Sequence, residues 1–144
     1  MTSRSGSRVI ALEEHYWDAG VAETFTGRNA TRSSDLLERL YDLGELRLKE
    51  MDEAGIDVQV LSHGAPSTQR LDAETGPKVA AAANNRLYET VQSNPDRFAA
   101  FAALATANPK AAADELERAV THLEFKGAMI HGLTNGVFCD GKEF

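Results

Sequence analysis

The sequence contains very little of several things, and each shortage excludes a class of protein. Its 144 residues include one cysteine, Cys139, so an internal disulfide is impossible and we expect a reducing compartment. No apolar run approaches the ~20 residues of a membrane-spanning helix, so we expect no membrane partner. Basic residues are few and scattered, with 15 Lys and Arg against 22 Asp and Glu and a formal net charge of -7. Because nucleic-acid binding needs a basic patch, we expect no nucleic-acid partner.

The amino terminus lacks an apolar segment. Residues 1–8, MTSRSGSR, are small and polar and do not have the pattern of a secretory signal. We predict that residues 1–8 form a polar tail, that residues 9–144 fold, and that the protein is cytoplasmic. The remaining composition, 42% hydrophobic and 26% charged, is that of an ordinary globular protein.

What is present is a regular alternation of short apolar runs and helical patterns. The apolar runs predict four strands, at residues 8–15, 58–62, 98–104 and 126–132. Leucines three and four residues apart, an alanine-rich stretch and a run that opens with Asn-Pro predict helices, at residues 33–55, 77–94 and 108–125. Gly44 is placed to break the first of these helices in two, and Gly55 is placed to end it.

Strands and helices that alternate strictly predict parallel strands joined by right-handed crossovers. No strand is followed by Gly-x-Gly-x-x-Gly or by Gly-x-x-x-x-Gly-Lys, so nothing favours a nucleotide-binding fold. The other α/β architecture with this order is the eight-stranded TIM-type barrel, which needs ~250 residues. The sequence therefore predicts an α/β fold that corresponds to the amino-terminal half of a TIM-type (β/α)8 barrel, with about four parallel strands.

In such barrels the functional groups lie at the carboxyl ends of the strands. Glu13 and His15 lie at the end of the first predicted strand, and regular alternation would place them on one face. A carboxylate and an imidazole on one face are two candidate ligands for zinc or a similar divalent ion. The alternative is a polar pair, hydrogen-bonded where the strand leaves the core.

Two further histidines follow predicted strands. His63 in LSHGAP and His131 in MIHGLTNG are candidates for substrate contact or metal ligation, or else are polar residues hydrogen-bonded to a loop. His122 lies among charged residues in a helical pattern, and we expect it on the surface. Trp17 and Phe25, in a polar loop, look exposed, and together with Tyr16 they either line an aromatic substrate pocket or pack the loop onto the top of the barrel.

Four blocks of the sequence resemble a known family. VIALEEHYW, RLKEMDEAGIDVQVLSHGAP, NPDRFAAFAAL and KGAMIHGLTNGVF occur in the order and spacing of the amino-terminal half of the amidohydrolase-2 group. Within this group the likeness is to γ-resorcylate and other hydroxybenzoate decarboxylases and to aminocarboxymuconate semialdehyde decarboxylase. It extends from about Val9 to the last residue.

The resemblance implies that Glu13 and His15 are two ligands of a catalytic zinc or manganese ion. It also implies that the loops after the second and fourth strands meet the substrate, which gives four candidate substrate-binding residues: His63, Ala65, His131 and Asn135. The implied substrate is a small aromatic carboxylic acid with a hydroxyl group, and the implied reaction is non-oxidative decarboxylation. In that reaction the metal ion holds the substrate as a Lewis acid, and a carboxylic acid side chain protonates the ring.

The family has parts with no counterpart in this sequence. These are a histidine after the fifth strand, a histidine-glutamate segment after the sixth and an aspartate after the eighth. We therefore expect an incomplete and inactive portion of a carboxy-lyase, which retains its metal ion poorly and lacks the proton donor. Two alternatives stay open: a metal-dependent hydrolase of the same superfamily, and a non-catalytic half-barrel that serves as an assembly module. Open sheet edges and an uncovered apolar face predict a homo-oligomer.

Overall fold

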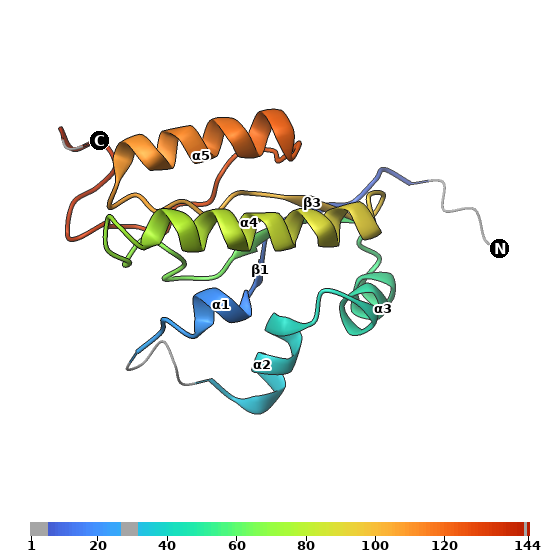
Figure 1. The fold of residues 1–144 in the computed structure, drawn as a ribbon. Coiled ribbons are helices and arrows are strands. Elements are labelled where there is room, and N and C mark those ends of the chain that lie inside the picture. Colours follow the sequence, from blue (N-terminus) through green and yellow to red (C-terminus); the bar gives the residue numbers. More distant parts are fainter. Residues whose placement is uncertain (1–5, 27–31, 143) are drawn as a thin grey trace.

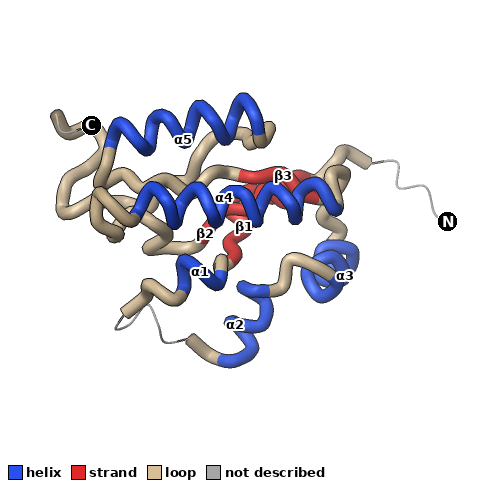
Figure 2. The backbone as a smooth tube through the Cα atoms, viewed as in Figure 1, coloured by secondary structure: helices blue, strands red, loops and turns tan. Residues whose placement is uncertain are grey.

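The centre of the fold is a short strand, β2 (Val58–His63), in which every residue is buried. It pairs in parallel with β1 (Ile10–Tyr16) on one side and with β3 (Phe98–Ala100) on the other, which gives the order β1-β2-β3. Figures 1 and 2 show this sheet in the computed structural model, which describes residues 6–26, 32–142 and 144. Burial of both faces is typical of a central strand in a parallel sheet.

Helices connect and cover the strands. They are α1 (Ala19–Ala22), α2 (Ser34–Tyr41), α3 (Glu45–Ala54), α4 (Gly76–Ser93) and α5 (Pro109–His122). In Figure 1, α4 lies across the sheet, with α5 along one side of it and α2 and α3 on the other. The sequence sets the helix ends locally: Asn108 Oδ1 accepts a hydrogen bond from Ala111 N (3.1 Å) at the start of α5, and Gly55 ends α3 with a φ of 72°.

The core lies between the sheet and the helices. Leu61 of β2 is fully buried in one apolar cluster with Met51 of α3 and Leu87 of α4. Because side chains alternate along a strand, residues 59, 61 and 63 of β2 face the helices, while residues 60 and 62 face the opposite way. We call the side of residues 60 and 62 the inner face of the sheet. This division decides which strand-end residues can form a common site.

The predicted alternation of strands and helices is confirmed, with differences in length. The helix predicted at 33–55 is interrupted at Gly44, as expected, and forms α2 and α3. The third strand is shorter than predicted, and the fourth contributes one parallel bridge, Ala102 to Ala128. Gly127 has a φ of 144°, which interrupts the extended backbone there. Ala102 N nevertheless donates to Gly127 O (2.9 Å), so this segment runs beside the third strand, as a barrel requires.

The loop after β1 differs from its prediction. It contains the short helix α1, and residues 27–31 of the loop lie outside the described residues. Trp17, expected to be exposed, is buried. Its ring packs edge-on against Phe25 (4.9 Å between centroids) and Tyr41 (6.1 Å). These aromatic residues therefore pack the loop onto the sheet, because burial of apolar rings outweighs the polarity of their neighbours in sequence.

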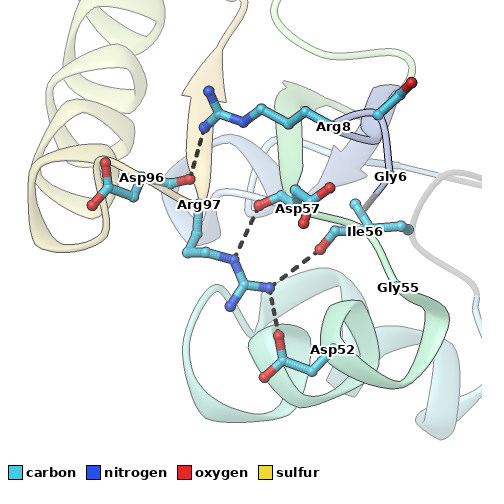
Figure 3. A pocket seen from close by; sticks show the side chains of 9 residues that line it. Gly6, Arg8, Asp52, Gly55, Ile56, Asp57, Asp96 and Arg97 are labelled. Carbon is cyan, nitrogen blue, oxygen red and sulfur yellow. Dashed lines mark hydrogen bonds and ion pairs between the residues drawn. The ribbon is translucent and has the colours of Figure 1, made fainter. Parts of the chain in front are cut away.

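The amino ends of the strands surround a hollow of about 560 Å³, shown in Figure 3. Arg97 crosses it and donates from Nε to Asp57 O (3.1 Å) and from Nη2 to Asp52 Oδ1 (2.7 Å). Arg8 Nη2 donates to Asp96 O (3.3 Å) nearby. These contacts tie α3, β2 and β3 together at the end of the sheet opposite to the predicted site. Within the described residues, no helix is both long and apolar enough to cross a membrane.

Candidate metal centre

β1 does not alternate regularly where Glu13 lies. Ala11 pairs with Gln59 and Glu14 pairs with Leu61, so β1 has one residue more than β2 over this stretch. Such a β-bulge bends a strand and re-aims its side chains, often next to active sites. Glu13 has a φ of 58°, in the left-handed region that is unfavourable for a residue with a side chain. The prediction that side chains alternate regularly along this strand is therefore wrong.

The bulge places His15 on the inner face. Glu14 pairs with Leu61 and so faces the helices, whereas His15 pairs with Ser62. His15 Nδ1 lies 2.9 Å from Oγ of Ser62, a fully buried residue. When Nδ1–H donates to this hydroxyl, the lone pair of the ring is at Nε2. Partial burial lowers the pKa of His15, and the charge of His131 lowers it further. A neutral ring with a fixed tautomer is the form that binds metal ions.

His131 lies beside His15, with their ring centroids 5.4 Å apart. Its Nε2 is 2.7 Å from His63 O, and because a carbonyl only accepts, Nε2 carries the hydrogen. The lone pair of the neutral ring is then at Nδ1. His131 N donates to Oε1 of the buried Gln69, and Gln69 Nε2 donates to Thr134 Oγ1 (3.2 Å). Gln69 thus fixes the segment that carries His131.

The ring of His63 lies on the helix-covered face and is fully buried. Its Nε2 accepts from Asp18 N (3.0 Å), so Nδ1 carries the hydrogen and donates to Gly64 O (2.9 Å). Burial lowers the pKa of His63 to about 4. Burial also opposes ionisation of Asp18. Two hydrogen bonds from Arg86 (2.7 Å each), a hydrogen bond from Val21 N and the charge of Arg86 together outweigh it and hold the pKa of Asp18 below its usual value. Both nitrogens of the His63 ring are therefore hydrogen-bonded to backbone groups of the fold, and it is the His63 carbonyl that contacts His131.

The remaining candidate residues lie in two separate hollows. Ala65 and His131 line one of about 250 Å³, together with the exposed Arg70. Asn135 lines the other, of about 270 Å³, beside the buried Thr134. Of the four predicted substrate-binding residues, the structure therefore brings Ala65 and His131 together and places Asn135 and the His63 ring elsewhere.

Glu13 and His15 offer donor types that suit a divalent metal ion. An exposed carboxylate and a neutral imidazole are accepted by both zinc and manganese. A complete centre needs three or four protein ligands. Within residues 6–26, 32–142 and 144, no group of three or more His, Cys, Asp or Glu is arranged to hold a metal ion. The described residues thus fit two positions of a metal centre.

Sequence reasoning missed Ser62 and Gln69. Ser62 could have been found by aligning the first two strands in parallel, because the residue beside His15 must then come from the end of β2. Gln69 lies in the loop that follows β2 and contacts His131 far along the chain. We find no signal in the sequence that would indicate this contact.

A comparison with protein families identifies the fold family. The family model described as Amidohydrolase matches residues 13–143. This chain belongs to the amidohydrolase family. The match begins at Glu13, so it includes all the strands and helices described above except the first three residues of β1. The resemblance that the four sequence blocks indicate is confirmed.

Curated relatives of this chain are decarboxylases. Gamma-resorcylate decarboxylase from Rhodococcus jostii (strain RHA1) is 40% identical over 137 residues, which are 92% of this chain and 41% of the relative. Gamma-resorcylate decarboxylase from Rhizobium sp. (strain MTP-10005) is 39% identical over 130 residues, 87% of this chain and 39% of the relative. The chain thus spans about two fifths of the length of these relatives.

Solved structures show the same relation. Dihydroxybenzoic acid decarboxylase from Polaromonas sp. JS666, with bound manganese and the inhibitor 2-nitroresorcinol, has a TM-score of 0.78 and 37% identity over 88% of this chain and 39% of its own. 5-Carboxyvanillate decarboxylase from Novosphingobium aromaticivorans DSM 12444, complexed with manganese, has a TM-score of 0.88 and 28% identity over 100% of this chain and 47% of its own. These likenesses confirm the predicted fold class, an α/β fold that corresponds to the amino-terminal half of a TIM-type barrel.

Proposed function

We propose that this chain supplies the opening half of the barrel of a metal-dependent decarboxylase that acts on a small hydroxylated aromatic acid. The observation that carries the proposal is His15, which lies at the carboxyl end of β1 with its Nδ1 held by Ser62. The 40% identity to a gamma-resorcylate decarboxylase supports the reaction class. The manganese in two solved relatives supports a divalent metal ion.

In this proposal Glu13 and His15 hold the metal ion, which is manganese or zinc. When bound, such an ion acts as a Lewis acid toward the carboxylate and hydroxyl oxygens of the substrate. With Nδ1–H donating to Ser62 Oγ, the lone pair of the His15 ring is at Nε2, and the lowered pKa of His15 favours the neutral ring. Both effects give the His15 ring the tautomer and charge state that bind a metal ion, in the metal-free protein as well.

His131 and Ala65 form the substrate side of the site. Because His131 Nε2 donates to a backbone carbonyl, its Nδ1 is oriented to accept a hydrogen bond from a substrate hydroxyl. We also propose Asn135 as a substrate contact from the neighbouring hollow. We propose that His63 acts on the substrate indirectly, because its carbonyl oxygen orients the His131 ring. A metal-dependent hydrolysis and a cytoplasmic location stay predictions of the sequence.

Replacement of either proposed ligand tests the metal centre. In the protein produced from its natural reading frame, we expect Glu13→Gln and His15→Gln each to lose manganese on desalting and to lower the decarboxylation of 2,6-dihydroxybenzoate about 100-fold or more, because each removes a ligand. Glu117→Gln and His122→Gln make the same chemical changes on the exposed surface of α5 and should keep both properties. Metal content is measured by mass spectrometry and product by chromatography. Retention of metal and rate by His15→Gln would show that the ligand assignment is wrong.

A second candidate function, an assembly module, is favoured by the exposed edge of β1. Ile10 and Leu12 are 55% and 60% exposed, and Val9 beside them is 43% exposed. An apolar edge strand is a template for pairing with another strand. We propose that two copies of the chain associate through this edge. A stable dimer with neither bound metal nor decarboxylation would favour this function over the enzyme.

A further inference from the structure

Arg47, near the start of α3, reaches β1 with its guanidinium. The guanidinium donates four hydrogen bonds, one of them to β1. Nη2 donates to His15 O (3.0 Å) and Arg39 O (2.8 Å), Nε to Asp42 O (2.9 Å) and Nη1 to Gln59 Oε1 (3.2 Å). The acceptors belong to β1, α2, the loop after α2 and β2. A planar fork of donors reaches such a set, and the single ammonium group of a lysine does not.

Gln59 extends this contact to the bulge. Its side chain is buried, accepts from Arg47 and donates from Nε2 to Glu14 Oε2 (3.0 Å). Gln59 pairs with Ala11, before the two residues Leu12 and Glu13 that oppose Val60 alone, and Glu14 follows these two residues. The Gln59 side chain therefore spans the bulge. Together with the bond from Arg47 to the His15 carbonyl, it fixes the strand directly after Glu13.

We propose that Arg47 is a positioning residue, which fixes the β1 bulge through Gln59 and the His15 carbonyl and so aims Glu13 and His15 at the metal ion. The inference rests on the proposed function of that pair. A left-handed glutamate persists only where surrounding contacts determine its conformation, and these are the contacts that flank Glu13. Arg47 contacts the backbone of one proposed ligand, His15, and reaches Glu14, the neighbour of the other, through Gln59. It forms no hydrogen bond with the donor atom of either ligand.

The chain provides a matched control at the other end of the sheet. Arg97 also joins α3 to the strands with a partly buried guanidinium, through Asp57 O, Ile56 O and Asp52 Oδ1 (Figure 3). It lies at the amino ends of the strands, away from Glu13. A purely structural arginine at this position should affect stability and leave metal binding unchanged.

Manganese affinity separates the two arginines. In metal-free protein from the natural reading frame, titrated with Mn²⁺ and followed by calorimetry and by the electron paramagnetic resonance of the bound ion, we expect Arg47→Met to weaken binding about 10-fold or more. Arg97→Met should lower the melting temperature without changing Mn²⁺ affinity or the spectrum. Arg47→Lys keeps the charge but loses the fork, so we expect it to behave as Arg47→Met does. It also serves as the second variant if Arg47→Met does not fold.

A metal-free measurement gives a second readout. In nitrogen-15 spectra of the His15 ring we expect the Nδ1–H tautomer in the unmodified chain, with Ser62 Oγ, 2.9 Å from Nδ1, as the acceptor of that hydrogen. We expect a mixture of tautomers in Arg47→Met and the unmodified pattern in Arg97→Met. An unchanged tautomer in both variants would overturn the inference about Arg47.

The outcomes distinguish this inference from the proposed function. If His15→Gln keeps full Mn²⁺ affinity, the proposed function fails and the inference fails with it. If His15→Gln loses Mn²⁺ while Arg47→Met and Arg47→Lys keep it, the function stands and the inference is overturned. Equal losses of affinity in Arg47→Met and Arg97→Met would assign Arg47 to stability alone and also overturn it.

Discussion

At the scale of one residue, His63 shows that a histidine at a strand end can have a structural role instead of a role in the site. It lies at a strand end, as His15 does, and it directly follows Ser62, the residue that contacts His15. Its place in β2 turns the ring toward the helices, where Asp18 N and Gly64 O engage both ring nitrogens. Burial lowers its pKa to about 4, so the fold holds the ring neutral.

The neutral His63 ring predicts a loss of stability in acid. The unfolded chain binds the proton near pH ~6.5 and the folded chain near the lowered pKa of about 4, so stability is complete above the first value and falls as the pH drops toward the second. We expect a loss of about 2–3 kcal/mol at pH 4.5, measured by urea unfolding at pH 7 and pH 4.5. His63→Gln should lack this part of the pH dependence, and His122→Gln, on the surface, should retain it. The same pH dependence in His63→Gln and the unmodified chain would contradict the assignment.

At the scale of one element, the starts of α5 and α2 differ in how their cap residues are used. Asn108 accepts from Ala111 N at the first turn of α5, and its Nδ2 donates to Ala73 O (3.1 Å). It thus caps its own helix and ties α5 to the loop before α4. Ser33, at the equivalent position before α2, makes no side-chain cap hydrogen bond.

This difference predicts unequal effects of the same truncation. We expect Asn108→Ala to lower the free energy of unfolding by about 1–2 kcal/mol, because both a cap and a loop contact are lost. Ser33→Ala removes no cap hydrogen bond and should change it by roughly 0.5 kcal/mol or less. Urea unfolding of the three proteins at pH 7 measures both values. A larger loss in Ser33→Ala than in Asn108→Ala would reverse the comparison.

The elements were predictable where the signal is local. Asn108 with Pro109 marks the start of α5, and Gly55 marks the end of α3, since capping depends on a few adjacent residues. The bulge at Glu13 was not predictable, because it is defined by what β1 pairs with in β2. The same limit applies to Arg47, whose acceptors lie on four segments. The Glu-x-His pair was therefore found from the sequence, but the contacts that orient it were not.

At the scale of the whole molecule, the sheet has a paired centre and an apolar edge. In the part of the chain that the structure describes, β1 pairs only with β2, while Ile10 and Leu12 remain more than half exposed. The opposite end of the order continues toward the segment at Ala128. A barrel closes by covering the edge of its first strand, so this edge is where further β structure would add.

The exposed edge predicts self-association that a single charge weakens. We expect Leu12→Lys to shift the chain toward monomer at a fixed concentration in sedimentation experiments, because a charged edge resists strand pairing. Val120→Lys places the same charge on an exposed valine of α5 (44% exposed) and should leave the association state unchanged. An equal shift in both variants would point to net charge as the cause instead of the edge.

The extra residue in β1 also has a consequence for the register of the sheet. Removal of Glu13 would leave Glu14 opposite Leu61 and His15 opposite Ser62, in the register that they already have, and would turn the bulge into a plain ladder. The bulge therefore holds an additional carboxylate at the end of the sheet while every later pairing of β1 with β2 stays in regular register.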